Sequence, residues 1–302
     1  MGRYTLCLCA VLLAAGGCNI RQYAIDQLAD ALSSGGGSAF ASDDDPELIR
    51  QALPFSLKLL ESLLAESPRH RGLLTSLCSG FAQYAYAFVM VDAEMAEERS
   101  LAEALAMRDR ARGLLLRARE YGLRALEMAH PGFRQALMNN PREAVKMARA
   151  ADVELLYWTG AAWALAIAVS KDRPDLIADQ PRVEALLDRA MELNEAYGEG
   201  ALRSVMISYE PSRQGATEPY EARCRRHFER AVAQSGGNLA APYVAYAEAV
   251  CLQKLDRRGF EEYLKKALAV DVNARPEWRL ANVIIQRRAK WLLSRVDELF
   301  VE

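Results

Sequence analysis

The stretch Asp152–Val169 (DVELLYWTGAAWALAIAV) decides the fold of this chain. Its two charged residues, Asp152 and Glu154, stand at the first turn of the helix that the pattern predicts, where carboxylates favour the helix dipole. The residues that follow are uncharged, and a helix that is apolar on every side is buried. Because a membrane-spanning helix needs about 20 strongly apolar residues, we predict instead the central helix of a larger helical protein.

The composition of the chain favours helices throughout. Its 302 residues allow one large domain or two small ones. Lys and Arg total 38 and Asp and Glu total 40, so the net charge is −2 and no basic face for nucleic acid is expected. Ala, Leu, Arg and Glu are abundant, and no window alternates in the manner of a strand. We therefore predict an all-α fold.

The N-terminal segment is typical of a secretory signal. Arg3 precedes an apolar run from Tyr4 to Ala15, and two glycines stand before Cys18. A cysteine after small residues is similar to a bacterial lipobox, in which its thiol takes a diacylglycerol and starts the mature chain. Ala15 stands where leucine is usual, so an ordinary cleaved signal is the alternative. Asn19 slightly favours anchoring in the outer rather than the inner membrane.

Three regions are expected along the chain. A lipoprotein signal peptide covers residues 1–17, a lipid-anchored flexible linker rich in Gly and Ser covers 18–42, and a helical repeat domain covers 43–302. Asp45 and Pro46 are expected to cap and begin the first helix of this domain, rather than to form part of a metal site.

Turn residues divide the domain into further helices. Pro54 is expected to interrupt the first one. A long amphipathic helix is expected over about 93–128, with an apolar side that carries Leu101, Leu105, Leu115 and Leu126. After the central helix, the pattern predicts helices at Pro181–Leu193, Gly200–Tyr209, Glu218–Gln234, Leu239–Leu252, Gly259–Val270 and Pro276–Phe300.

A recurring Ala-Leu-x-Leu pattern indicates helix-hairpin repeats. It occurs in degenerate form at Ala125, Ala190, Ala231 and Ala267, which are separated by 65, 41 and 36 residues. A tetratricopeptide repeat has a period of 34 residues and a small residue at this place. The two shorter separations fit a repeat with short insertions, and the longest fits one repeat with a large insertion. We predict an α-solenoid of helix hairpins, with an irregular helical bundle as the alternative.

The sequence offers little for catalysis or metal binding. His70, His130 and His227 lie far apart, and neither a Gly-x-Ser-x-Gly motif nor a phosphate loop occurs. We predict neither enzymatic activity, nor a metal site, nor a bound cofactor. Of the cysteines after Cys18, Cys78 is expected as a buried thiol; Cys224 and Cys251 are expected as buried thiols too, with a disulfide between them as the alternative.

Aromatic and basic residues are the better candidates for binding a ligand or partner. Trp163 is expected in the core. Tyr157 and Trp158 are candidates for the wall of a cleft, because buried Tyr and Trp need partners for their O–H and N–H groups. Three further candidates are expected on the concave side of the solenoid, with core packing as the alternative for each: Arg203, Tyr209 and Tyr246. Arg287 and Arg288, beside Trp291, are expected to form a charged rim over that ring.

With these residues collected, the chain resembles the TatT family, the T component associated with tripartite ATP-independent periplasmic (TRAP) transporters. The run Tyr157–Trp163 (YWTGAAW) is the most specific mark. The other marks are Pro46–Leu48, Leu53–Lys58, Gln83–Phe88, Arg279–Asn282 and Arg288–Leu293.

The resemblance implies a periplasmic helical lipoprotein with about four cryptic tetratricopeptide-like motifs. It implies a homotrimer that binds the solute-binding (P) subunit of the transporter and reaches the membrane through the lipid on Cys18. It also implies a cleft or pore for a hydrophobic or organic-acid ligand. A protein that binds or conducts such a ligand directly, without a P subunit, is the alternative function.

Overall fold

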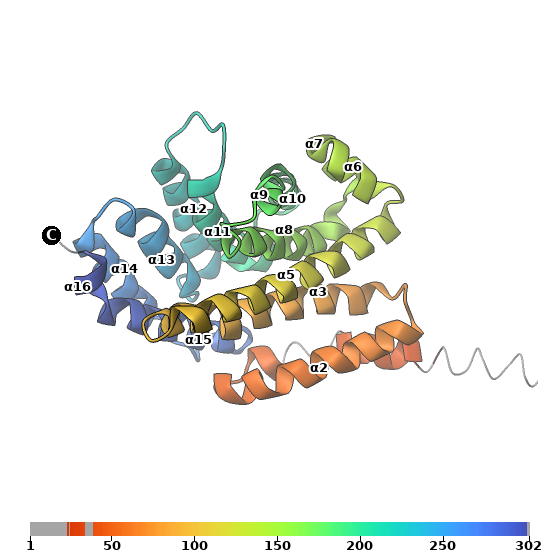
Figure 1. The fold of residues 1–302 in the computed structure, drawn as a ribbon, viewed down its shortest axis with the longest axis horizontal. Helices are drawn as coiled ribbons and strands as arrows, with labels where there is room; N and C mark the ends of the chain where they lie inside the picture. Colours follow the sequence, from red (N-terminus) through yellow and green to blue (C-terminus); the bar gives the residue numbers. More distant parts are fainter. Residues whose placement is uncertain (1–22, 24, 34–38, 301–302) are drawn as a thin grey trace, which may run out of the picture.

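The computed structural model describes residues 23, 25–33 and 39–300, and every regular element within these ranges is a helix (Figure 1). The prediction of an all-α fold is confirmed. The helices up to the central one are α2 (Pro46–Glu66), α3 (Arg71–Ala85), α4 (Val91–Glu97), α5 (Leu101–Ala129), α6 (Phe133–Asn139), α7 (Pro141–Ala144) and α8 (Val153–Ala168).

The second half of the chain continues in the same manner. Its helices are α9 (Pro174–Ile177), α10 (Gln180–Leu193), α11 (Ala201–Tyr209), α12 (Tyr220–Ser235), α13 (Ala241–Tyr246), α14 (Arg257–Leu268), α15 (Arg279–Ser294) and α16 (Val296–Leu299). Two π-helical segments, Tyr86–Met90 after α3 and Ala247–Leu252 after α13, interrupt the regular α geometry. Short 3₁₀ turns connect several of the other helices.

Helix α8 lies at the centre of the first half, as its sequence predicts. It packs against α5 and α10 and also contacts α3. Ten of its 16 residues are buried, so most of its circumference is covered by other helices, whereas the stripe with Glu154, Trp158 and Leu165 is partly exposed. Asp152 precedes it and accepts hydrogen bonds from Arg149 N (2.8 Å), Arg71 Nη2 (2.7 Å) and His130 Nε2 (2.8 Å). These contacts balance the buried carboxylate at the helix N-terminus.

Small residues allow α5 and α10 to approach α8 closely. A Cβ atom at Gly122 of α5 would lie 2.0 Å from Thr159 Oγ1 and 2.9 Å from Cys78 Sγ. A Cβ atom at Gly160 of α8 would lie 2.9 Å from the side chain of Leu187 on α10. Any larger residue at either position would force the helices apart, because interiors have almost no free volume.

Helix α2 begins as predicted but runs through Pro54. Asp45 Oδ1 accepts hydrogen bonds from Glu47 N (3.0 Å) and Leu48 N (3.1 Å), and Pro46 is the first helical residue. The expected interruption at Pro54 is wrong, because the helix continues to Glu66. A proline costs a helix interior about 3 kcal/mol.

The burial of apolar side chains on both sides of Pro54 offsets this cost. Ile49, Leu57 and Leu64 are buried against the body. Each contributes about 1.5–3 kcal/mol, so their sum exceeds the cost of the proline.

The expected helix over 93–128 is two helices. The chain leaves α4 at Glu97, and Ser100 starts α5 by accepting a hydrogen bond from Glu103 N at 3.2 Å. This Ser-x-x-Glu cap is present in the sequence but lies inside a strong apolar period. Leu115 and Leu126 are buried as predicted, whereas Leu101 and Leu105 lie beside this break and are exposed.

Part of the segment expected as a linker is folded. Residues 25–33 are helical and Ala29 is fully buried. Ser67 Oγ donates to Asp26 Oδ1 at 2.8 Å, so this short helix is attached to the turn after α2. The Gly- and Ser-rich composition that favours a linker begins only at its end. The signal peptide and Cys18 lie outside the described residues.

The helices pack mainly against their neighbours in the chain. Examples are α2 on α3, α3 on α5, α8 on α10, α11 on α12 and α13, and α14 on α15. Buried apolar residues form two clusters, and α11 contributes to both, with Met206 in the first and Ile207 in the second. Neighbour packing is common to solenoids and irregular bundles, so the tetratricopeptide-like repeats stay a prediction.

One continuous helical run, Arg71–Glu97, is long and apolar enough to cross a membrane by length and composition. In this fold 61% of its apolar window is buried within the body. It comprises α3, the first π-helical segment and α4, and it packs against α2, α5 and α8. This burial is what a core helix requires.

Two glycines of α5 provide a matched test of the close packing. We expect Gly122→Ala to lower the free energy of unfolding by about 1–3 kcal/mol, because its methyl group overlaps Thr159 and Cys78. At Gly113 a Cβ atom would have nothing within 4 Å, so Gly113→Ala should raise the same free energy by about 0.5–1 kcal/mol. Urea denaturation measures both; effects of the same sign would contradict the packing described here.

Candidate functional site

Trp163 is a core residue, as expected. Its side chain is fully buried, and Nε1 donates a hydrogen bond to Asp179 Oδ2 at 3.2 Å. The guanidinium of Arg119 lies over the indole ring, 4.7 Å from its centroid. Every face of the ring is therefore in use, and Trp163 is not available to a ligand.

Tyr157 and Trp158 lie together, as expected of neighbours at a common site. The Tyr157 ring is in edge contact with Trp158 (centroids 4.7 Å apart) and lies 5.2 Å from the ring of Tyr197. Tyr157 is buried, whereas Trp158 is partly exposed at the edge of the cluster. Burial raises the pKa of Tyr157, and its hydroxyl forms no hydrogen bond with another described residue. A hydroxyl without a protein partner can form a hydrogen bond with a polar ligand atom.

Arg203 belongs to a chain of polar contacts between α11 and α12. It pairs with Glu195, and its Nη1 lies 3.0 Å from His227 Nδ1. A guanidinium can only donate, so Nδ1 accepts and the proton of a neutral ring is on Nε2. That nitrogen faces Glu210 Oε1 at 3.4 Å.

Glu210 is the centre of this network. Its carboxylate is buried and is contacted by Arg213 at 3.2 Å and Arg223 at 2.5 Å in addition to His227. Burial by itself raises the pKa of Glu210, but hydrogen bonds from His227 and Arg223 and the charge of Arg213 outweigh it and lower the pKa to about 2. Several cationic donors thus hold one buried anion.

Tyr209 lies beside the same network. Its hydroxyl donates to Glu184 Oε1 at 3.2 Å, and Arg213 lies over its ring at 5.7 Å. Arg213 also forms a bidentate pair with Asp188 (2.7 and 2.8 Å). The structure therefore brings Arg203 and Tyr209 into one connected network, in which Tyr209 is buried and serves packing.

Tyr246 lies in a separate aromatic cluster. Its ring contacts Phe228 (5.0 Å) and Tyr263 (4.8 Å), and Arg225 lies over it at 5.8 Å. It is buried, so the core alternative holds for Tyr246 as it does for Tyr209.

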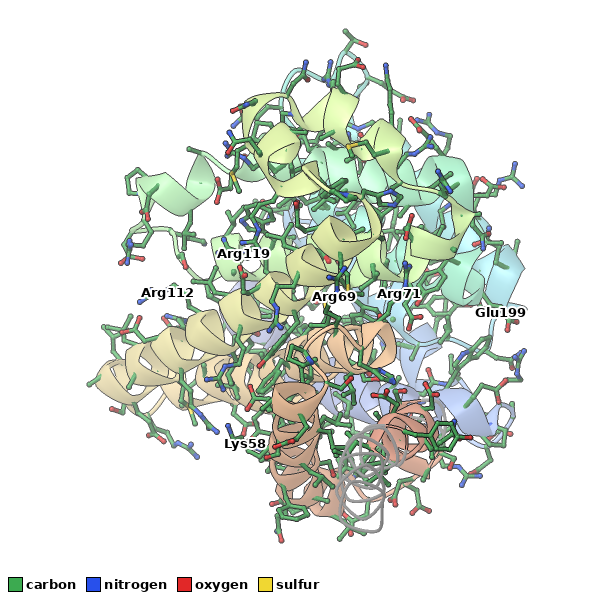
Figure 2. The ribbon with its side chains drawn as sticks, turned by 90° about the vertical axis from the view of Figure 1, so that its right-hand side faces the viewer. Lys58, Arg69, Arg71, Arg112, Arg119 and Glu199 are labelled. Carbon is green, nitrogen blue, oxygen red and sulfur yellow. The ribbon has the colours of Figure 1, made fainter. Side chains whose placement is uncertain are left out.

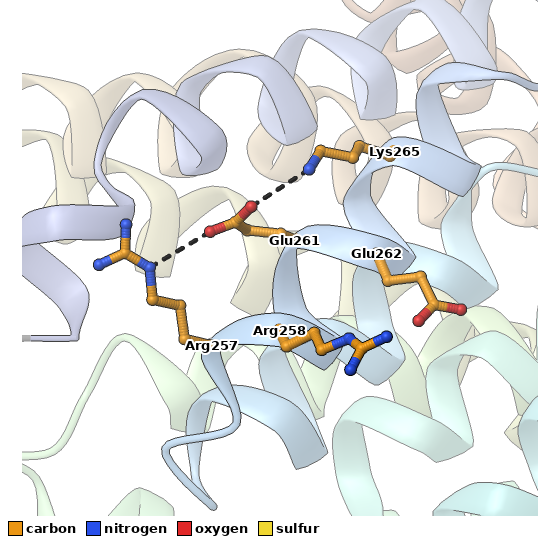
Figure 3. A pocket seen from close by; sticks show the side chains of 5 residues that line it. All are labelled: Arg257, Arg258, Glu261, Glu262 and Lys265. Carbon is orange, nitrogen blue, oxygen red and sulfur yellow. Dashed lines mark hydrogen bonds and ion pairs between the residues drawn. The ribbon is translucent and has the colours of Figure 1, made fainter.

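Two shallow hollows on the described surface are lined by charged side chains. The larger, of about 480 Å³, runs along α14 and is lined by Arg257, Arg258, Glu261, Glu262 and Lys265 (Figure 3). The other, of about 350 Å³, is lined by Glu195, Arg203, Arg226, Glu229 and Arg230. Arg203 is thus the one predicted residue that borders a hollow. Tyr157 and Trp158 border neither, so the cleft expected beside them stays a prediction.

A buried ion cluster that the sequence did not reveal joins distant parts of the chain. Arg288 of α15 lies over the ring of Trp291 as expected, 5.9 Å from its centroid, but it is buried rather than part of a solvent-facing rim. It pairs with Glu94 of α4 (2.6 Å) and, in bidentate fashion, with Glu248 (2.6 and 3.2 Å). Tyr86 lies close enough for its charge state to influence the pKa of Arg288. The three acidic and basic residues are 40 to 194 positions apart, which no local pattern can indicate.

This cluster lies at both π-helical segments. Tyr86 begins the first and Glu248 lies within the second. Such segments often mark functional positions, because the extra residue in the turn re-aims side chains. Burial raises the pKa of Glu94 despite the nearby Arg288. The cluster couples α4 to the C-terminal helices.

The cysteines have surroundings that do not favour reactivity. Cys78, Cys224 and Cys251 are buried free thiols, so the disulfide alternative is not what the structure has. Burial raises the pKa of Cys78 and of Cys224 to about 12, far from a reactive thiolate. Within residues 23, 25–33 and 39–300, no group of three His, Cys, Asp or Glu side chains is arranged to hold a metal ion.

The Glu210 network predicts a pH-dependent contribution to stability. Its folded pKa of about 2 lies below its ordinary value of 4.5, so the contribution is complete above pH 4.5 and is lost as the pH falls towards 2. We expect Glu210→Gln to lower the free energy of unfolding at pH 7 by about 3 kcal/mol, since it leaves the largely buried Arg223 without its anionic partner. The exposed carboxylate Glu218 pairs with Arg226, and Glu218→Gln should leave the urea midpoint unchanged. A Glu210→Gln deficit that is equally large at pH 2.5 would contradict the assignment.

The sequence of this chain is similar to those of known proteins. The family model described as "TRAP transporter T-component" (TAtT) matches residues 42–300, which is the helical body from just before α2 to the end of α16. An uncharacterised protein of Treponema pallidum (strain Nichols) is 28% identical over 97% of this chain and 96% of its own length. The match covers α8 together with the polar network and the ion cluster. The chain therefore belongs to the family of TRAP transporter T-components, which are periplasmic, membrane-associated proteins of a transport system.

Proposed function

We propose that this protein is a non-enzymatic, lipid-anchored periplasmic scaffold that binds the solute-binding (P) subunit of a TRAP transporter. In this proposal residues 1–17 are the signal, Cys18 carries the lipid, residues 18–42 connect it to the body, and residues 43–302 bind the partner. The body assembles as a homotrimer and assists the transfer of a hydrophobic or organic-acid ligand. The single observation that supports the proposal most is the family match over residues 42–300.

We propose the hollow between α11 and α12 as the docking face. Arg203 pairs with Glu195 and Arg226 pairs with Glu218 at its edge, but Glu229 and Arg230 form no ion pair with another described residue. Unpaired charges at a hollow are available to complementary charges on a partner and increase the rate of association. The hollow on α14 is less suitable, because there Glu261 already pairs with Arg257 (3.2 Å) and Lys265 (3.1 Å), as Figure 3 shows.

Charge reversal in the proposed docking face tests this function. We expect Arg226→Glu combined with Arg230→Glu to weaken binding of the purified solute-binding subunit about tenfold or more, because two favourable charge contacts become repulsive. Biolayer interferometry at moderate salt measures the affinity.

The matched control reverses charges in the other hollow. Arg257→Glu with Arg258→Glu changes the net charge by the same amount and should leave the affinity unchanged. Equal losses of affinity in both double variants would show that binding depends on the net charge of the protein and not on the proposed docking face. The absence of any complex with the wild-type protein would reject the scaffold function.

A direct ligand-binding protein is the second candidate function. The observation that favours it is the Tyr157 hydroxyl, which forms no hydrogen bond with another described residue and lies next to the partly exposed Trp158. A carboxylate or hydroxyl of an organic ligand would satisfy that group while the aromatic rings contact its apolar part. Such a ligand would have to separate Trp158 from Tyr197.

Tryptophan fluorescence distinguishes the two functions. If a ligand enters beside Trp158, titration with fatty acids or organic acids changes the emission of the wild-type protein, and Trp158→Phe removes that change. The three other tryptophans, Trp163, Trp278 and Trp291, remain as internal references. A saturable change that persists in Trp158→Phe would place the ligand elsewhere. If no ligand changes the emission, the scaffold function is the one of the two that is supported.

A further inference from the structure

Helix α2 has a second apolar side that faces away from the body. Ile49, Leu57 and Leu64 are buried on its inner side. Leu48, Phe55 and Leu59 are exposed, and their spacing of seven and four residues puts them on one stripe of the helix. Phe55, at 73% exposure, is among the most exposed large apolar residues of the described chain. Figures 1 and 2 both show α2 along the lower edge of the molecule.

The short helix at 25–33 adds to this exposed apolar surface. Tyr23 is 65% exposed and Leu28 is also exposed. The helix is fixed to the turn after α2, because Ser67 bonds Asp26 and His70 lies 3.2 Å from Asp30. Half of the exposed large apolar side chains of the described residues therefore belong to the first 60 residues: Tyr23, Leu28, Leu48, Phe55 and Leu59. We call these five residues the apolar stripe.

The length of chain between Cys18 and Tyr23 indicates what covers the apolar stripe. Five residues span at most about 17 Å, since an extended chain advances about 3.5 Å per residue. A lipid on Cys18 would thus hold a membrane surface within that distance of Tyr23, which is itself attached to the body beside α2. An exposed apolar face that is kept so close to a bilayer is suited to insertion among lipid head groups.

We propose that the apolar stripe lies in the membrane interface, so that α2 rests lengthwise on the lipid surface. This inference rests on the proposed lipid anchor and adds the orientation of the body. From Leu48 to Ser62 the stripe on α2 bears uncharged residues, with Gln51 and Ala52 beside its apolar members. Glu66 follows at the end of the helix, and the charged Lys58 projects from the flank of α2 (Figure 2). Binding is therefore governed by apolar contact, and high salt weakens it little.

The experiment uses the chain from residue 18 with Cys18→Ser, which carries no lipid, and vesicles of phosphatidylethanolamine and phosphatidylglycerol. Phe55→Trp is added as a reporter, and brominated acyl chains in the vesicles quench it if it inserts. Leu255→Trp is the matched control, because Leu255 is 74% exposed but lies in the turn before α14. We expect quenching at residue 55 and none at residue 255, in low and high salt.

A second variant measures the contribution of the stripe. Leu48→Ser with Phe55→Ser should weaken vesicle flotation about tenfold or more, while circular dichroism confirms the helical fold. An unquenched Phe55→Trp in the folded protein overturns the proposal. So does emission that is already blue-shifted without vesicles and depends on protein concentration, since a second copy then covers the stripe. Mass spectrometry of wild-type Cys18 tests the anchor separately, because the vesicle assay contains no lipidated protein.

Discussion

The close approach of α5 to α8 at Gly122 is the constraint on which the rest of the fold depends. Only hydrogen at that position leaves room for Thr159 and Cys78, and the same central helix meets α10 at Gly160. With its neighbours at this distance, α8 buries Trp163 and most of its other side chains, and the charged groups that contact its interior, Arg119 and Asp179, do so at the Trp163 indole. The polar contacts lie around this apolar centre: Asp152 accepts a hydrogen bond at the N-terminus of α8, and Asp179 accepts one from the Trp163 indole.

Much of this could be read from the sequence, and the exceptions have physical reasons. The central helix, the Asp45 cap and most of the later helix boundaries follow from local rules of composition and capping, and the structure confirms them. The helix expected over Pro276–Phe300 is wrong as a single element, because it is divided at Arg295 into α15 and α16. The break at Ser100 is hidden because the apolar period continues across it. Pro54 is misleading because a local penalty is outweighed by burial, which depends on α3 and the rest of the body.

In the candidate site, too, the features set by local sequence could be predicted and those set by contacts between distant residues could not. Trp163 in the core follows from its position among small residues, but Arg203 could be connected to Glu210 through His227 only in three dimensions. The place of Arg288 could not be predicted because its partners, Glu94 and Glu248, are remote in the chain. Long-range ion pairs between helices have no sequence period, and so a single sequence does not show them.

The first π-helical segment has a consequence for the length of the chain. A π turn accommodates one residue more than an α turn, so Tyr86–Met90 shifts the phase of all that follows on the same helical run. A chain with one residue fewer there would close into a regular α-helix and turn Glu94 by about 100° around the axis, away from Arg288. The number of residues along the run from α3 to α4 therefore sets the direction of the Glu94 side chain, independently of which residues are used.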